Sequence, residues 1–290
     1  MICDPFKEFR RHFKILASKN SKAILNTLSN VFTMRLIGNK THGDLAEIAL
    51  SEFINQFMYD YRSEHVGKDL FRAKEHEEDI LVTNELTGQA IPISLKAYGD
   101  GPLQLSTDKE GQLFPFLERY GKEICDKGKL CSIFSSVEFS KLEELNILPL
   151  IYREGEMKCN IMHFDFEKVK KEVNRIIFIS EKEQFDYKSG TVVSKKGRSH
   201  PIFLFVNAKN EYICEVRYGG KSANALQRGF WTHTKHGQSY FDSLTNGWVD
   251  YSHNPILVKL FSLALNSTRS CHAESCKILQ KGIDILKVIQ

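Results

Sequence analysis

The feature that most constrains the fold of this chain is a change of hydrophobic period between residues 69 and 98. The first seventy residues are mainly helical in pattern, because apolar residues in "DPFKEFRRHFKILASK" and "THGDLAEIALSEFINQFMYDY" recur every three or four positions. Residues 69–98 instead contain "DILVTN" and "AIPISLKAY", which are short, rich in β-formers and separated by "ELTGQ". This pattern predicts a β-hairpin that follows the helices.

The expected pairing of the hairpin brings opposite charges together. With the turn centred at 87–88, the apolar residues of both strands share one face. Asp79 then lies opposite Lys96 on the other face, with Ser94 on the same side. A shift of one residue would break this sorting. An exposed Asp–Lys pair at a strand end contributes only about 0–1 kcal/mol, and this purely structural interpretation stays open.

The residues around the hairpin favour a functional interpretation. Glu77, Glu78 and Asp79 are consecutive, and their mutual repulsion is costly unless a cation or solvent lies among them. Glu47 interrupts the apolar stripe of the preceding helix and needs a partner if it points inward. After Lys96, "AYGDGPLQLS" contains residues that let the backbone approach another surface, and Gln104 there could donate to anionic oxygens.

This arrangement resembles the PD-(D/E)xK nucleases, particularly type II restriction endonucleases. In that family a helix glutamate precedes a hairpin, an aspartate begins one strand, and an acid–x–lysine triplet lies in the next. The resemblance covers residues 43–106. The chain departs from the pattern twice, because Glu78 replaces the proline and Ser94 replaces the second acid. Some restriction enzymes of this superfamily also carry Ser–x–Lys.

The resemblance implies a restriction-endonuclease-like α/β fold with a mixed central sheet flanked by helices. It implies that Asp79 and the main-chain carbonyl of Leu95 hold Mg²⁺, with Glu47 bound directly or through water and Glu78 as the second choice. Lys96 would position the attacking water and stabilise charge on phosphorus, and Ser94 would bond a metal-bound water. Magnesium prefers oxygen ligands and keeps several waters, so few protein ligands suffice.

The rest of the chain alternates helical and strand patterns, which also predicts mixed α/β. The segments "GQLFPFLERYGKEICDKGK", "SKLEELNI", "SANALQRGFW" and "PILVKLFSLALNS" are helical in pattern, and "FEKVKKEVNRIIFI" begins as helix. "LPLIYR" is strand-like, and "HPIFLFVN" and "EYICEVRY" pair around "AKN". We expect one domain over residues 1–290, with a catalytic core at 41–155 and a DNA-recognition and structural extension at 156–290.

A second polar region, residues 212–237, could contact DNA. Its amide and guanidinium side chains suit guanine and adenine edges. Together with Gln104, the expected DNA contacts are Arg217, Lys221, Asn224, Gln227, Arg228 and Lys235. An amphipathic helix with a solvated polar face is the alternative. The basic segment 188–200 could bind phosphates or be a plain exposed loop, and His233 and His236 could ligate a metal only with partners that the sequence does not supply.

The same region contains a competing catalytic triplet. Glu215–Val216–Arg217 ends a strand much as Ser94–Leu95–Lys96 does, with Asp186 as a possible partner. We rank it lower, because arginine does not deprotonate and the segment between Asp186 and Glu215 contains a strand of its own.

Composition excludes several classes of protein. Forty Lys and Arg against 36 Asp and Glu give a formal charge of +4, so any affinity for DNA must come from local patches. No run approaches the roughly 18 apolar residues of a membrane span, and the N-terminal residues lack the apolar core of a secretory signal. The seven cysteines are dispersed and odd in number, which favours reduced thiols and a cytoplasmic location. "CHAESC" (271–276) lacks a second pair at zinc-finger spacing.

We therefore expect a Mg²⁺-dependent, sequence-specific endonuclease of double-stranded DNA. A homodimer is expected because palindromic sites mirror a two-fold axis, and a cognate DNA methyltransferase is the expected genetic partner. Two alternatives remain open. One is a structure-specific repair or recombination nuclease of the same superfamily, and the other is a DNA-binding protein without catalysis in which Asp79 and Lys96 are structural.

Overall fold

The structure is a computed structural model that divides into two compact units. It describes residues 4–37, 42–65, 79–108, 110–142, 146–195, 197–218, 227–267 and 273–289. Unit 1 consists of residues 1–99, 148–163 and 243–290, and unit 2 of residues 100–147 and 164–242. The expected bounds, 41–155 and 156–290, differ from this division because the chain passes between the units repeatedly. The roles assigned to those two segments stay predictions.

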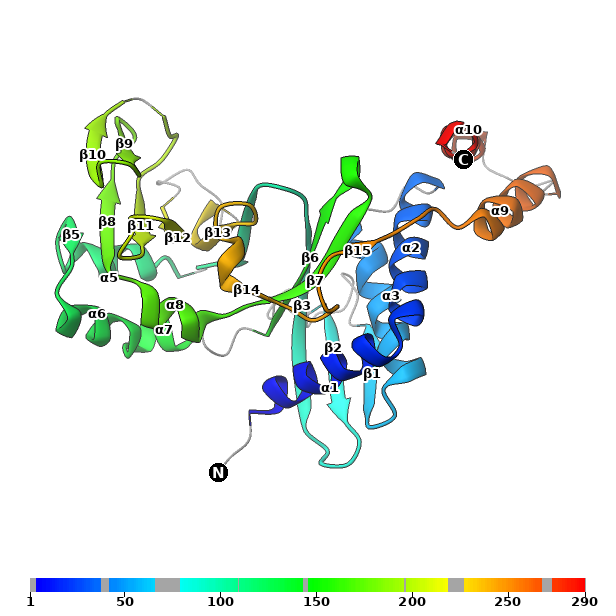
Figure 1. The fold of residues 1–290 in the computed structure, drawn as a ribbon, viewed down its shortest axis with the longest axis horizontal. Helices are drawn as coiled ribbons and strands as arrows, with labels where there is room; N and C mark the ends of the chain where they lie inside the picture. The colour runs from blue at the N-terminus through cyan, green and yellow to red at the C-terminus, as the bar shows by residue number, and fades with distance from the viewer. Residues whose placement is uncertain are drawn as a thin grey trace. The chain divides into compact units, whose positions relative to one another are not determined.

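Unit 1 contains most of a sheet in the order β1–β2–β3–β6–β7–β14, with β15 paired to β7, and the boundary with unit 2 falls within β14. In Figure 1 its long N-terminal helices lie beside the hairpin strands. Its strands are β1 (Tyr61–His65), β2 (Ile80–Asn84), β3 (Ala90–Tyr98), β6 (Ile147–Arg153), β7 (Lys158–Phe164), β14 (Phe241–Ser243) and β15 (Val249–Asp250). Its helices are α1 (Pro5–Lys19), α2 (Ser21–Ile37), α3 (His42–Phe57), α9 (Pro255–Ser267) and α10 (Ala273–Ile289).

The predicted helix at the N-terminus is confirmed as α1. The Asp4 side chain accepts a hydrogen bond from the Phe6 amide at 3.0 Å, and Pro5 occupies the first turn, where no amide donor is needed. Phe9 and Phe13 are fully buried in the core formed by α1, α2, α3 and the sheet. The helix forms because one apolar stripe faces that core.

The C-terminal helices of unit 1 pack on α2. Val258 of α9 and Leu286 of α10 form a small apolar cluster with Ile37. A Cβ atom on Gly282 would lie 2.1 Å from the Leu36 carbonyl oxygen, so α10 approaches the end of α2 more closely than a larger residue allows. The predicted helix at residues 255–267 is confirmed as α9, whereas the sequence pattern did not predict α10.

Unit 2 contains a sheet in the order β4–β13–β12–β11–β8–β5 and a separate β9–β10 pair. Short helices cover one face through buried phenylalanines, among them Phe139, Phe205 and Phe230. The strands are β4 (Pro102–Ser106), β5 (Glu123–Ile124), β8 (Arg175–Ile179), β9 (Glu183–Asp186), β10 (Thr191–Ser194), β11 (Ile202–Val206), β12 (Tyr212–Arg217) and β13 (Gly229–His233). The helices are α5 (Leu113–Glu118), α6 (Lys127–Phe134), α7 (Val137–Ser140) and α8 (Phe166–Glu172).

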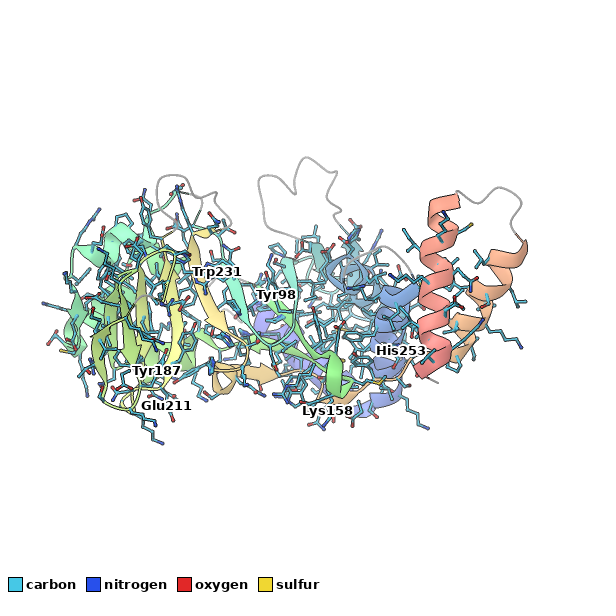
Figure 2. All side chains as sticks on the ribbon, turned by 90° about the horizontal axis from the view of Figure 1, so that it is seen from above. Tyr98, Lys158, Tyr187, Glu211, Trp231 and His253 are labelled. Carbon is cyan, nitrogen blue, oxygen red and sulfur yellow. The ribbon has the colours of Figure 1, made fainter. Side chains whose placement is uncertain are left out.

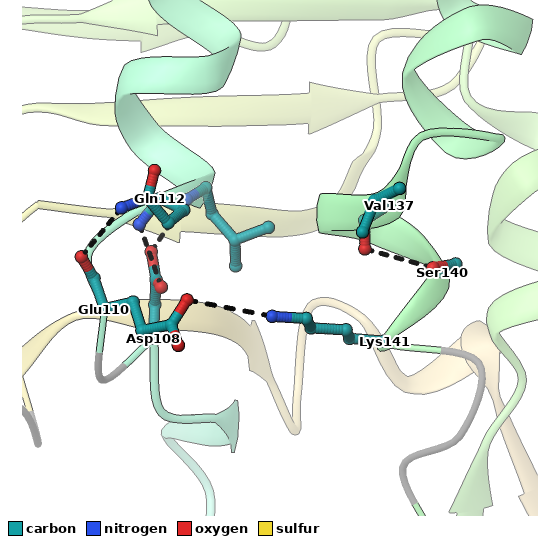
Figure 3. A network of polar contacts seen from close by, with 7 residues as sticks. Asp108, Glu110, Gln112, Val137, Ser140 and Lys141 are labelled. Carbon is teal, nitrogen blue, oxygen red and sulfur yellow. Dashed lines mark hydrogen bonds and ion pairs between the residues drawn. The ribbon is translucent and has the colours of Figure 1, made fainter.

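Side-chain hydrogen bonds hold the backbone where the short helices of unit 2 begin, and Asp126, Ser136 and Asp165 are the N-caps of α6, α7 and α8. Asp108 accepts hydrogen bonds from the amides of Gln112 and Leu113 at 3.0 and 2.8 Å, just before α5 (Figure 3). The expected continuous helix through "GQLFPFLERYGKEICDKGK" is wrong. Gly121 has a φ of 101°, which ends the helical region, and the next residues pair with β8 as β5 before α6 begins.

The expected helix at "SANALQRGFW" is wrong over its last three residues. Residues 221–226 lie outside the described residues, but Gly229, Phe230 and Trp231 belong to β13. That strand pairs with both β4 and β12, and a Cβ on Gly229 would meet the Ser106 carbonyl oxygen at 2.0 Å. Pairing on both edges outweighs the local helical spacing.

The mixed α/β class expected from the sequence is confirmed at this level. The paired strands β11 and β12 and the strand β6 are also confirmed. Among the described helices, none combines the length and apolarity that crossing a membrane requires. Cys125, Cys131, Cys159 and Cys214 are free thiols, as expected, but Cys276 is disulfide-bonded, which corrects the expectation at that position.

Candidate functional site

The predicted hairpin forms, but its register differs by two residues from the expected one. Ile80 pairs with Ile93, not with Leu95. The Asn84 side chain accepts hydrogen bonds from the Leu86 and Thr87 amides at 3.0 and 3.2 Å, and Gly88 has a φ of 71°. These bonds move the centre of the turn back by one residue. A shift of two preserves the faces, so the apolar sorting of the two strands remains as expected.

Because of this register, Asp79 lies against Ser94 and Leu95 and not opposite Lys96. Its Oδ2 atom accepts the Leu95 amide at 2.6 Å and the Ser94 hydroxyl at 2.9 Å. Its own amide donates to the Ile93 carbonyl at 3.0 Å. Asp79 immediately precedes β2, and its side chain accepts the β3 amide hydrogen bond that a main-chain carbonyl of a longer β2 would otherwise accept.

The orientation of Leu95 follows from the same bond. In an antiparallel strand, the N–H and C=O of one residue point to the same neighbouring strand. Since the Leu95 amide reaches Asp79, the Leu95 carbonyl also points to the edge where Asp79 lies. The structure thus brings together one carboxylate and one main-chain carbonyl, which are both oxygen donors.

Lys96 lies on the same face of β3 as Ser94. Residues 91, 93 and 95 are buried, whereas the alternate residues 94, 96 and 98 are half-buried. Tyr98, labelled in Figure 2, continues this face at the end of the strand. Within the described residues, the Lys96 ammonium has no ion pair and no hydrogen bond, so the predicted Asp79–Lys96 pair does not form.

Glu47 lies on the other face of the sheet. It is buried on α3, and its Oε2 atom lies 3.1 Å from Nε2 of His65. His65 is opposite Ile80, whose side chain points into the core. Among the described residues, no hydrogen bond or ion pair joins Glu47 to Asp79, Ser94 or Lys96. Sequence reasoning missed His65, which is 18 residues from Glu47 in sequence and whose ring nitrogen can bond a carboxylate.

The remaining predicted metal ligand, Glu78, lies outside the described residues, as does Glu77. In the part of the chain that the structure describes, no group of three His, Cys, Asp or Glu side chains could hold a metal ion. A metal at Asp79 would therefore depend on the Leu95 carbonyl, on water, and on groups outside that part.

The predicted DNA contacts that the structure describes all lie in unit 2. The Gln104 amide donates to the Arg228 carbonyl at 2.7 Å, which joins β4 to the start of β13. Gln227 and Lys235 are exposed, and Arg228 is half-buried. Lys221 and Asn224 lie outside the described residues. The rings of His233 and His236 are tilted by 46° with centroids 4.4 Å apart, and the Lys235 and His236 amides donate to Nδ1 of His233.

The competing triplet forms a different arrangement. The Glu215 side chain is only 3% exposed and is bonded to Nε of Arg217, while NH1 of Arg198 lies 3.5 Å from its other oxygen. The Asp186 carboxylate instead accepts the Ser189 hydroxyl and the Lys188 amide, bonds that lower the pKa of Asp186. Among the described residues no contact joins Asp186 to Glu215. Sequence reasoning missed Arg198, which comes from a distant loop.

Comparisons with protein-family models, with curated proteins and with solved structures found no match to this chain.

Proposed function

We propose that this protein is a magnesium-dependent, sequence-specific endonuclease of double-stranded DNA that resembles type II restriction enzymes. The observation that carries the proposal is the pair of hydrogen bonds from Ser94 and Leu95 to the Asp79 carboxylate. They hold that carboxylate against a Ser–x–Lys segment, next to the Leu95 carbonyl. Carboxylate and carbonyl oxygens are the donors that magnesium prefers.

In this proposal Asp79 and Leu95 would hold the ion. A bound Mg²⁺ supplies Lewis acidity and lowers the pKa of a bound water. Glu47 is engaged by His65 in the structure, so Glu78 is the better remaining candidate for a second carboxylate. Lys96, without a partner among the described residues, is available to orient an attacking water and to stabilise negative charge that develops on phosphorus. Ser94 would hold both Asp79 and a water by its hydroxyl.

The substitution Asp79→Asn distinguishes a metal-binding role of Asp79 from a purely structural role as a hydrogen-bond acceptor. In Asp79→Asn the side-chain oxygen still accepts the Leu95 amide, but the negative charge is lost. We expect the variant to fold and to bind its DNA site without magnesium, while cleavage of plasmid DNA in magnesium falls by about 100-fold or more. Lys96→Ala should give the same result, because its ammonium makes no hydrogen bond or ion pair among the described residues that the fold would lose, while the proposed stabilisation of charge on phosphorus would be removed.

The matched control is Glu64→Gln on the neighbouring strand β1, which removes an exposed carboxylate whose ion-pair partner among the described residues is the exposed Arg62, at 3.2 Å. It should cleave at the wild-type rate. Full cleavage activity in Asp79→Asn would remove the catalytic assignment. The products on plasmid DNA also distinguish a restriction endonuclease from a repair or recombination nuclease. Discrete fragments support the restriction endonuclease, and branch-specific nicks support the repair or recombination nuclease.

One observation favours a second candidate, a DNA-binding protein without catalysis. Asp79 completes the hydrogen bonding of β3, which is a sufficient structural reason for an aspartate at this position. If the protein only binds DNA, we expect Asp79→Asn to behave as wild type. DNA binding would then not depend on magnesium, and no divalent metal would support cleavage.

The proposed partners follow from the nuclease assignment. A palindromic target would be bound by a homodimer, which sedimentation with and without DNA would detect. A site-specific nuclease in a cytoplasm also requires protection of the host DNA, so we expect a DNA methyltransferase gene beside the gene for this chain.

A further inference from the structure

The guanidinium of Arg217 is held in one orientation on the sheet of unit 2. Its Nε atom donates to Glu215, the residue two positions earlier on β12. Its flat face lies over the ring of Trp231, with the central carbon 4.1 Å from the ring centroid. Trp231 is on β13 (labelled in Figure 2) and is directly opposite Glu215. Trp231 on β13 thus contacts the flat face of the Arg217 guanidinium, and Glu215 on β12 accepts a hydrogen bond from its Nε atom.

The outer nitrogens of Arg217 have no hydrogen-bond acceptor in the part of the chain that the structure describes. The Arg217 side chain is 18% exposed. The Glu215 carboxylate also lies 3.5 Å from Arg198, so two guanidinium groups share one negative charge. The surface therefore carries excess positive charge and a planar pair of donors with a defined direction.

Arg175 in the same unit shows the opposite use of an arginine. Its side chain is 21% exposed, close to the value for Arg217. Its outer nitrogens donate to the Gly190 carbonyl and to the Asn210 side chain, and pair with Glu123 at 2.9 Å. Arg175 joins parts of the fold, whereas the described contacts of the Arg217 guanidinium are made through Nε and through its flat face.

We infer that Arg217 reads a guanine in the DNA target through its two outer nitrogens, and that Glu215 and Trp231 are positioning residues for it. This inference rests on the proposed function. The two donors match the O6 and N7 acceptors of guanine in the major groove. A DNA phosphate can accept hydrogen bonds from many directions, so a phosphate contact gains little from a fixed Arg217 guanidinium. A base edge requires donors in one orientation, which the fixed guanidinium supplies. Gln104, opposite Trp231 on β4, donates its amide to the Arg228 carbonyl and so fixes the neighbouring strand.

The experiment selects bound sequences from a random duplex pool in the absence of magnesium, using the full-length chain. Wild type should enrich one sequence that contains guanine. Arg217→Lys keeps the charge but loses the planar pair of donors. We expect its preference at one G·C pair to fall by about 10- to 100-fold, with every other position unchanged. Arg175→Lys is the matched control and should select the wild-type sequence.

A chemical change in the DNA tests the contact without relying on the folding of a variant. Replacing that guanine by 7-deazaguanine removes the N7 acceptor, which should weaken wild-type binding by roughly 10-fold and leave Arg217→Lys unaffected. Glu215→Gln should weaken preference at the same pair only. Loss of preference at several pairs would show that Glu215 supports the sheet as a whole and would overturn its role as a positioning residue.

Three other outcomes are distinguishable. Uniform weakening of Arg217→Lys on all sequences, with a smaller salt dependence, would mean a phosphate contact and would overturn the inference. An unchanged selection profile would overturn it as well. A wild-type protein that enriches no sequence would instead overturn the proposed function itself, on which the inference rests.

Discussion

Single residues decide the register of the hairpin that carries the proposed site. The alternation of apolar residues in β2 and β3 was enough to predict which residues share a face, because one face of the hairpin is buried and the other is half-buried. It could not predict the register to better than two residues. That choice depends on the Asn84 side chain, which bonds two amides of the turn, and on the left-handed backbone of Gly88.

The turn can be tested at Gly88. The site has open space for a Cβ, so Gly88→Ala tests the backbone conformation alone. Because a left-handed φ is unfavourable for alanine, we expect the free energy of unfolding to fall by about 1–2 kcal/mol. Gly155→Ala is the matched control, since it also has open space but no positive φ. Urea unfolding followed by circular dichroism measures both, and equal effects would contradict the assignment of the turn.

Whole elements were predictable from two kinds of apolar pattern. The stripe of α1 matches its buried face. The β11–β12 pair was predictable from apolar runs around a turn, because β11 is buried at all of its residues. The apolar spacing of α9 predicted a helix, although Ile256, Leu260 and Leu263 are exposed. Prediction was wrong for residues 229–231, where β4 and β12 supply hydrogen bonds on both edges of β13. It also missed the partners of buried acids: His65 and Arg198 are distant in sequence from Glu47 and Glu215, and local spacing does not encode such contacts.

The contact between α10 and α2 can be tested at Gly282. Its Cβ position lies 2.1 Å from a main-chain oxygen and 2.8 Å from the Ile37 Cα, neither of which can rotate away. We expect Gly282→Ala to displace α10 and to lower the free energy of unfolding by about 1–3 kcal/mol. The exposed neighbour Lys281→Ala should have little effect. Faster amide hydrogen exchange confined to α10 in Gly282→Ala would identify the affected helix.

At the scale of the whole molecule, we expect acid stability to depend on His163, a half-buried histidine at the core of unit 1 that packs on the buried Phe6. Burial, and then the nearby Arg10, lower the pKa of His163 from 6.5 to about 3. The ring packs on Phe6 with centroids 5.6 Å apart. Between pH 6.5 and pH 3 the unfolded chain binds a proton at this position and the folded chain does not. Stability is therefore lost as the pH falls through this window.

We expect His163 to contribute a slope of about 1.4 kcal/mol per pH unit below pH 6.5. His163→Leu removes the proton site, so its unfolding free energy should fall less steeply with acid over the same window. Chemical unfolding at pH 7, 6, 5 and 4 measures this slope, with the exposed His236→Gln as control. A variant as acid-sensitive as wild type would show that other groups determine the acid limit.

The repeated passage of the chain between the two units has a consequence for synthesis in the cell. The sheet that carries Asp79 and Lys96 takes strands from residues 61–65 through to residues 249–250. A ribosome delivers the proposed catalytic residues before unit 2, but the last two strands of the sheet only after most of unit 2 has been synthesised. The strand pairing of this sheet is therefore completed late in synthesis. A chain truncated before residue 249 lacks β15 and leaves Lys158 and Cys159 of β7 unpaired at the edge that β15 covers.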